Sequence, residues 1–201
     1  MHERHEIGWD QGSWLNEPPE HRVDGAALLM TTGAETDFWR TTGYGFVHDN
    51  GHALLTPLPV GAAVEVSFVA AFDHLYDQAG VLVRVDETTW TKAGIEFTDG
   101  VAHLGAVVTS GRSDWSLAPV PEWGGCELTV RVSRAGDALT VRARRGAEPW
   151  RMVRFAPLAP DAAAMAGPFC CSPLRAGLRV RFTGFRTGPA DAELHATPPP
   201  A

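Results

Sequence analysis

The sequence is poor in cysteine and in clustered basic residues, and each shortage excludes a class of protein. Its three cysteines, Cys126 and the adjacent Cys170 and Cys171, form neither a disulfide framework nor a CxxC metal pattern. We therefore expect three reduced thiols. No basic run exceeds the pair Arg144-Arg145, and the formal net charge is −7. Because neutralising phosphates requires clustered positive charge, nucleic acid is not expected as a partner.

Long hydrophobic runs are also missing. No apolar stretch approaches the ~20 residues of a membrane helix, and residues 1–6 lack the cationic and apolar regions of a signal peptide. These absences predict a soluble cytoplasmic protein with no membrane partner. The 201 residues are enough for one buried core. We expect one domain over residues 1–187 and a disordered tail over residues 188–201, which end in three prolines and an alanine.

What the sequence does contain is short alternating strands. Roughly a dozen segments alternate apolar and polar residues, and Gly- and Pro-rich turns separate them at intervals of about 8–12 residues. This pattern predicts an all-β, two-sheet antiparallel sandwich. Asn50-Gly51 between apolar residues predicts a type I′ hairpin turn. Helix-forming residues occur together only at 160–166, where flanking prolines limit them to a turn or two.

The clearest alternation lies in a predicted hairpin over residues 76–97. If its apolar residues face one core, Arg84 and Lys92 share the opposite face, which requires a loop of about three or five residues. A three-residue loop would set Arg84 opposite Lys92. A five-residue loop instead sets Arg84 opposite Trp90 and Gln78 opposite Glu96. Because opposed like charges are unfavourable, we predict the five-residue loop.

Six segments together resemble a known family. These segments are Asp37-Phe38-Trp39-Arg40, Tyr44-Gly45-Phe46 with Asp49-Asn50-Gly51-His52, Tyr76-Asp77-Gln78-Ala79-Gly80, Lys92-Ala93-Gly94-Ile95-Glu96-Phe97, Ser113-Asp114-Trp115-Ser116 and Gly167-Pro168-Phe169-Cys170-Cys171-Ser172-Pro173. With them the chain resembles, over about residues 10 to 187, the domain of unknown function 1349 family, which includes enolase-regulator-like proteins and is similar in fold to the concanavalin A-like lectin and glucanase superfamily. The resemblance implies a jelly-roll sandwich with one concave sheet, a face that often binds carbohydrate in that superfamily.

One face of the central strands offers a candidate ligand site. A sugar site combines a flat aromatic side chain with charged and amide groups, because buried hydroxyls must find hydrogen-bond partners. The candidate binding residues on neighbouring strands are Gln78, Arg84, Trp90, Lys92, Glu96, His103 and Trp115. An alternative is that Lys92 and Glu96 form a solvated ion pair and the tryptophans pack on loops.

Two catalytic interpretations are weaker. Glycoside hydrolysis usually needs two carboxyl groups, and Glu96 has no acidic neighbour two positions away, so a partner must come from another strand or a loop. A metal site would recruit either His48, Asp49 and His52 or Asp73, His74 and Asp77, and neither set has convincing ligand spacing. We predict no catalytic residue, metal or cofactor.

The sequence therefore predicts a non-catalytic binding or regulatory module that recognises a small polar ligand, in particular a saccharide or sugar derivative. The first alternative is a protein-interaction regulator of central carbon metabolism, as the family resemblance implies. The second is a weak glycoside hydrolase that uses Glu96. The oligomeric state, and whether residues 1–37 cover the concave face, stay open at this point.

Overall fold

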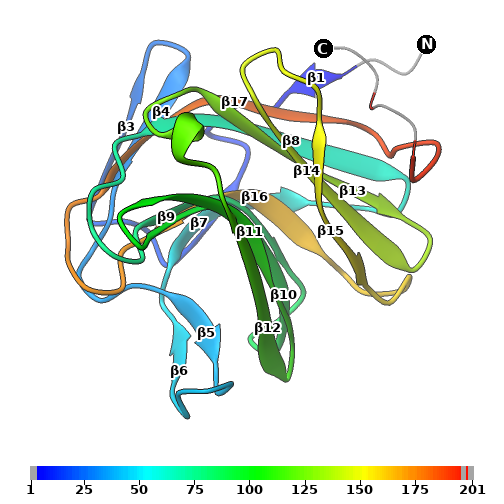
Figure 1. The fold of residues 1–201 in the computed structure, drawn as a ribbon. Helices are drawn as coiled ribbons and strands as arrows, with labels where there is room; N and C mark the ends of the chain where they lie inside the picture. The colour runs from blue at the N-terminus through cyan, green and yellow to red at the C-terminus, as the bar shows by residue number, and fades with distance from the viewer. Residues whose placement is uncertain (1–3, 196–197, 199–201) are drawn as a thin grey trace.

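Two antiparallel β-sheets pack face to face in the computed structural model, which describes residues 4–195 and residue 198 (Figure 1). Within these residues the only helical element is a 3-10 turn, η1 (Pro121–Trp123), and no α-helix occurs. This arrangement confirms the predicted all-β jelly-roll sandwich. None of the described residues forms a helix with the length and hydrophobicity to cross a bilayer.

The larger sheet has eight strands in the order β15-β14-β13-β8-β17-β4-β3, with β1 paired to β17. The strands β13, β14 and β15 form the meander that their alternation predicts. The bounds are β1 (His5–Glu6), β3 (Glu20–Asp24), β4 (Ala27–Thr31), β8 (Ala62–Ala70), β13 (Leu128–Ala135), β14 (Ala138–Arg145), β15 (Arg151–Pro157) and β17 (Arg179–Pro189).

The second sheet has seven strands in the order β12-β11-β10-β9-β16-β7-β2. In its central hairpin Trp90 pairs with Arg84 and Glu96 pairs with Gln78, which confirms the five-residue loop. The bounds are β2 (Ser13–Leu15), β7 (His52–Pro57), β9 (Gln78–Arg84), β10 (Thr89–Thr98), β11 (Val101–Ser110), β12 (Arg112–Pro119) and β16 (Met165–Cys171).

The main core lies between the two sheets. Val66 and Phe68 on β8 meet Val81 and Val83 on β9 in one continuous buried cluster, and their removal from water is the main force that holds the layers together. A smaller cluster, which includes Phe38, lies on the opposite face of the seven-stranded sheet. The concave face is therefore partly covered.

The cover over the concave face is a short hairpin, β5 (Phe38–Arg40) paired with β6 (Val47–Asp49). The predicted type I′ turn at Asn50-Gly51 is wrong, because neither residue has the positive φ that such a turn requires. Asn50 instead holds the hairpin base, since its Oδ1 accepts from the backbone N–H of Asp37 at 3.0 Å.

The predicted helical turn at residues 160–166 is also wrong. Met165 and Ala166 already belong to β16, which pairs with β7 on one side and β9 on the other. Because Ala164 and Ala166 are buried there, ladder hydrogen bonds and burial outweigh the helix propensity of alanine.

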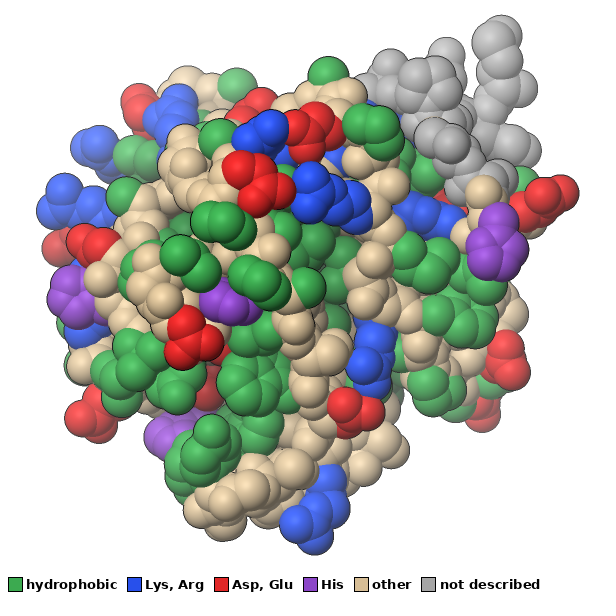
Figure 2. Space-filling model, in the orientation of Figure 1, with side chains coloured by type: hydrophobic (Ala, Val, Ile, Leu, Met, Phe, Trp, Pro, Cys, Tyr) green, Lys and Arg blue, Asp and Glu red, His purple; other side chains and the backbone are tan. Residues whose placement is uncertain are grey.

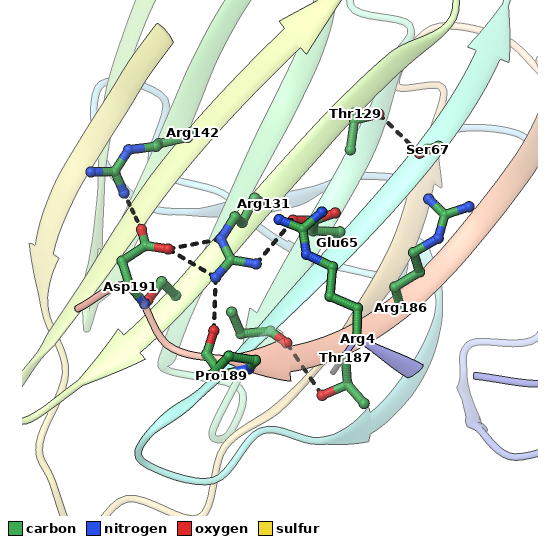
Figure 3. Close-up of polar contacts among 12 residues, drawn as sticks. Arg4, Glu65, Ser67, Thr129, Arg131, Arg142, Arg186, Thr187, Pro189 and Asp191 are labelled. Atoms are coloured by element: carbon green, nitrogen blue, oxygen red, sulfur yellow. Dashed lines mark hydrogen bonds and ion pairs between the residues drawn. The ribbon is translucent and has the colours of Figure 1, made fainter. Parts of the chain in front are cut away.

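The prediction that a disordered tail starts at residue 188 places its start too early in the chain. Gly188 and Pro189 continue β17 alongside β8, and Asp191 forms buried ion pairs with Arg131 and Arg142. Figure 3 shows the Arg131 guanidinium between Asp191 and Glu65, which it reaches at 2.9 Å. These contacts fix the chain through residue 191 against the outer face of the larger sheet. Residues 196–197 and 199–201 of the predicted tail lie outside the described residues.

Replacing Asp191 by alanine should destabilise the protein by about 3 kcal/mol, because two buried guanidinium groups would lose their shared carboxylate. Urea unfolding monitored by tryptophan fluorescence measures this change. Asp137→Ala removes an exposed carboxylate and is the matched control. Equal unfolding midpoints for the two variants would contradict a structural role for Asp191.

Candidate functional site

A cavity of about 300 Å³ lies between the concave face of the seven-stranded sheet and the β5–β6 hairpin. Figure 1 shows this hairpin projecting beneath the sheet, beside the strands β10 to β12. On the same face, Figure 2 shows hydrophobic side chains gathered around the hairpin, with acidic side chains among them. The lining residues are Glu35, Asp37, Trp39, Tyr44, Phe46, His48, Tyr76, Gln78, Lys92, Glu96, Val107, Trp115, Pro173 and Leu174.

Polar contacts hold the hairpin over the sheet. The guanidinium of Arg84 on β9 donates to both carboxylate oxygens of Asp49, at 2.5 and 2.7 Å. At the other side, the backbone N–H of Arg40 donates to Ser113 Oγ on β12 at 2.9 Å. Bidentate pairs of this kind fix orientation as well as distance. The cavity is therefore bounded by two elements that are tied together.

The floor of the cavity carries a buried ion pair. Lys92, the only lysine in the chain, is 3% exposed, and its Nζ donates to Asp37 Oδ1 at 2.6 Å. Burial alone would lower the pKa of Lys92, but the Asp37 carboxylate raises it, and the net shift is upward. Lys92 therefore stays an ammonium ion and cannot serve as a neutral nucleophile at neutral pH.

Glycines let Lys92 and Glu96 share this floor. Both side chains project from the same face of β10, and the residue between them on that face is Gly94, which pairs with Gly80 and Gly105 on the neighbouring strands. A Cβ atom at Gly94 would lie 2.1 Å from the backbone oxygen of Ala79, so the close approach of β9 and β10 requires glycine. No side chain separates the two charged groups on their strand.

Glu96 is the second ionisable group on the floor. It is 7% exposed, and its Oε1 has no hydrogen-bond partner among the described residues. Burial raises the pKa of Glu96 to about 7, while Lys92 lowers it and Asp37 raises it. At neutral pH this carboxyl group exchanges between an acid that donates and a carboxylate that accepts.

Aromatic rings form the walls. The ring of Trp39 meets those of Tyr44 and Trp115 edge to face, with centroids 5.6 and 6.1 Å apart, and Tyr44 stacks on Phe46 at 5.3 Å. Tyr44, Phe46 and Trp115 are 59%, 44% and 40% exposed. Exposed aromatic surface beside a cavity is typical of a binding site, because a ligand removes it from water.

The structure divides the seven candidate residues of the sequence analysis. Gln78, Lys92, Glu96 and Trp115 line the cavity. The other three share the sheet face but serve different contacts: Arg84 binds Asp49, Trp90 packs against Phe38 in the smaller cluster, and His103 donates Nδ1–H to the backbone oxygen of Val101.

Residues of the hairpin and the loops are the part of the site that sequence reasoning missed. Asp37, Trp39, Tyr44 and Phe46 lie far from β10 in the sequence, and no alternation pattern connects them to it. One feature of the sequence does point to a missing acidic residue. Lys92, the single lysine among 17 basic residues, lies on a strand predicted to be half buried. Such a lysine requires an acidic partner from elsewhere in the chain.

Two residues of the first metal set weighed from the sequence, His52 and Asp49, are held by other contacts. His52 donates Nδ1–H to the backbone oxygen of Asn16 at 2.6 Å and accepts from Gly33 through Nε2, and burial lowers its pKa. Asp49 is bound by Arg84.

The second set, Asp73, His74 and Asp77, does come together. The guanidinium of Arg175 donates to Asp73 at 2.8 Å and also binds Asp77, so an arginine already supplies the positive charge at this cluster.

Comparison with known proteins assigns the family. The model of the family described as "Protein of unknown function (DUF1349)" matches residues 14–190. The chain belongs to this family. It is 38% identical over 188 residues to Regulation of enolase protein 1 of Saccharomyces cerevisiae. The matched region covers 92% of this chain and 93% of the yeast protein.

Solved structures share the fold. One match is the crystal structure of a functionally unknown protein from Saccharomyces cerevisiae, with 35% identity, a TM-score of 0.86, and coverage of 93% of this chain and 100% of that chain. The glycoside hydrolase family 43 protein BlXynB from Bacillus licheniformis, as a K247S mutant, matches with a TM-score of 0.68 and 12% identity over 92% of this chain and 39% of that chain. At this identity the second likeness shows the sandwich fold alone.

Glu96 should make stability depend on pH. Its pKa is raised from 4.5 to about 7 by folding, so its favourable contribution is complete below pH 4.5 and is lost as the pH rises through 7. At about 1.4 kcal/mol per pKa unit, the loss is roughly 3 kcal/mol. Glutamine does not titrate, so Glu96→Gln should gain this amount relative to wild type between pH 4 and pH 8.

Urea unfolding at both pH values measures this difference. Glu87→Gln, an exposed substitution in the β9–β10 turn, is the control and should keep a constant difference from wild type. A constant difference for Glu96→Gln as well would show that the carboxyl group does not titrate near neutrality.

Proposed function

We propose that this protein is a non-catalytic binding module whose ligand is a small polar molecule, in particular a saccharide or sugar derivative. The observation that carries the proposal is the cavity of about 300 Å³ between Lys92, Glu96 and the rings of Trp39 and Trp115. Its volume suits a molecule of about one or two sugar rings, and preformed pockets of this kind hold small ligands. Its aromatic walls suit the apolar face of a sugar ring.

The polar floor supplies the hydrogen bonds that a polyol needs. Gln78, Lys92 and Glu96 reach the cavity from adjacent strands, and together they offer donors and acceptors. Glu96 Oε1 has no partner among the described residues. A buried polar atom without a partner is costly, so a ligand hydroxyl that binds it recovers free energy.

Trp115→Ala should weaken sugar binding about fivefold, because ring stacking of this kind contributes on the order of 1 kcal/mol. Tryptophan fluorescence titrated with a panel of mono- and oligosaccharides measures affinity. Trp150→Ala is the matched control, since Trp150 packs under Arg144 outside the cavity. A wild-type protein that responds to no sugar would overturn the saccharide proposal.

The same mixtures test the glycosidase alternative. Glu96 and Asp37 line one cavity, and a carboxyl with a raised pKa near a carboxylate resembles the acid and base of glycoside hydrolases. Asp37, however, is already bound by Lys92. Released monosaccharide in wild type that disappears in Glu96→Gln would establish hydrolysis in place of simple binding.

The second candidate function is regulation of enolase through protein contact. The name of the yeast relative supports it, and Tyr44, Phe46 and Leu174 provide exposed apolar surface beside the cavity. A cytoplasmic location is part of this proposal, because the free cysteines Cys126, Cys170 and Cys171 suit a reducing compartment.

Sedimentation of the protein with purified enolase from the same organism tests the regulatory candidate. We expect a complex that Phe46→Asp abolishes, because a charge would have to be buried in an apolar contact. Phe155→Asp changes an exposed ring on the other sheet and should leave the complex intact. Failure of the wild-type proteins to associate at micromolar concentration would contradict this function.

A further inference from the structure

The charges around the cavity are unequal. Glu35, Asp37 and Glu96 bring three carboxyl groups, and Lys92 brings the one permanent cation. Asp37 neutralises Lys92 through the 2.6 Å contact. The charge that is left belongs to Glu35 and Glu96, so an anionic ligand would meet a net negative surface.

Two carboxyl oxygens in the cavity lack donors. Asp37 Oδ1 accepts from Lys92 Nζ and from the backbone N–H of Phe38, whereas no hydrogen bond reaches Oδ2 from any described residue. Glu96 Oε1, unlike Asp37 Oδ2, belongs to the buried atoms that have no partner among the described residues. Both oxygens can accept hydrogen bonds from N–H or O–H donors, and the bond from a charged donor is the stronger one.

The walls favour the same kind of ligand. Trp39, Tyr44, Phe46, Tyr76 and Trp115 surround one cavity, and the negative faces of aromatic rings attract cations. Tryptophan is the strongest of these partners, and two tryptophans meet here at an interplanar angle of 89°. The face of a ring is negative and its edge is positive, so the ammonium group of a ligand would lie over a face of one of these rings.

We infer that the cavity selects an organic cation, a small polar molecule that carries a protonated or quaternary amine, such as an amino sugar. The inference rests on the proposed binding function and names the ligand class for it. The ammonium group would lie among the rings and the free oxygens of Asp37 and Glu96, while Gln78 and Lys92 would bind the polar remainder.

Affinity for such a cation should rise with pH. Ionised Glu96 attracts the ligand and protonated Glu96 does not, so binding strengthens as the pH passes through about 7. His48 lines the same cavity, so the profile is also measured in His48→Gln. The other ionisable groups that face Glu96 are Lys92 on its own strand, Asp37 before β5, Tyr76 before β9, His103 opposite it on β11 and Cys171 on β16.

Two matched ligand pairs test the inference by isothermal titration calorimetry. The first pair is 6-amino-6-deoxyglucose and glucose, and the second is choline and its neutral isostere 3,3-dimethylbutan-1-ol. We expect the cationic member of a pair to bind at least about tenfold more tightly at pH 8, and this preference to fall about tenfold at pH 5.5. Glu96→Gln should reduce the preference and flatten the pH profile, whereas Glu87→Gln should change neither.

Each outcome separates the two proposals. If glucose and the neutral alcohol bind as tightly as 6-amino-6-deoxyglucose and choline, or more tightly, the cation inference is overturned. The saccharide proposal still stands in that case if glucose binds. Binding of choline with no response to either sugar supports the cation inference and overturns the saccharide proposal. An unchanged preference in Glu96→Gln, or no binding of any of the four probes, overturns the inference.

Discussion

The ion pair between Lys92 and Asp37 is the interaction on which the candidate site depends. It joins β10 of the seven-stranded sheet to the start of the β5–β6 hairpin, at 2.6 Å and with the lysine 3% exposed. A buried ammonium ion without its carboxylate would cost about 3–5 kcal/mol. The pair therefore requires the hairpin to stay over the sheet, and the space between them is the cavity.

The same pair sets the chemistry of its surroundings. Because Asp37 neutralises Lys92, the ammonium ion does not fully compensate Glu96, and burial raises the pKa of that carboxyl to about 7. The thiol of Cys171, 3.7 Å from Asp37 Oδ1, is kept protonated by burial, which raises its pKa. The thiol is neutral and the lysine is paired, so neither is an activated nucleophile, whereas Glu96 is a group of this site that titrates near pH 7.

Buried charged side chains lie on two faces of the sandwich, and their surroundings differ. On the outer face of the larger sheet, Arg131 lies between Glu65 and Asp191 and forms an ion pair with each of them (Figure 3). That network closes the fold around the end of β17. In the cavity the pairing is incomplete, since Glu96 Oε1 has no partner among the described residues. Glu65 Oε2 in the outer network also lacks a partner in the part of the chain that the structure describes, but Glu65 is held by the Arg131 guanidinium through its other oxygen, whereas Glu96 faces a cavity.

The sequence by itself determined the sandwich, the register of the β9–β10 hairpin and the sheet face that carries Gln78, Lys92 and Glu96. Period-2 alternation and charge repulsion are local properties, so residues close in the chain reveal them. Only the tertiary structure decided that Asp37 and the rings of the β5–β6 hairpin would complete a cavity, that Arg84 and Trp90 would hold this hairpin instead of lining the cavity, and that Asp191 would be buried. Those outcomes depend on contacts between residues 35 to 60 positions apart, which no local pattern encodes.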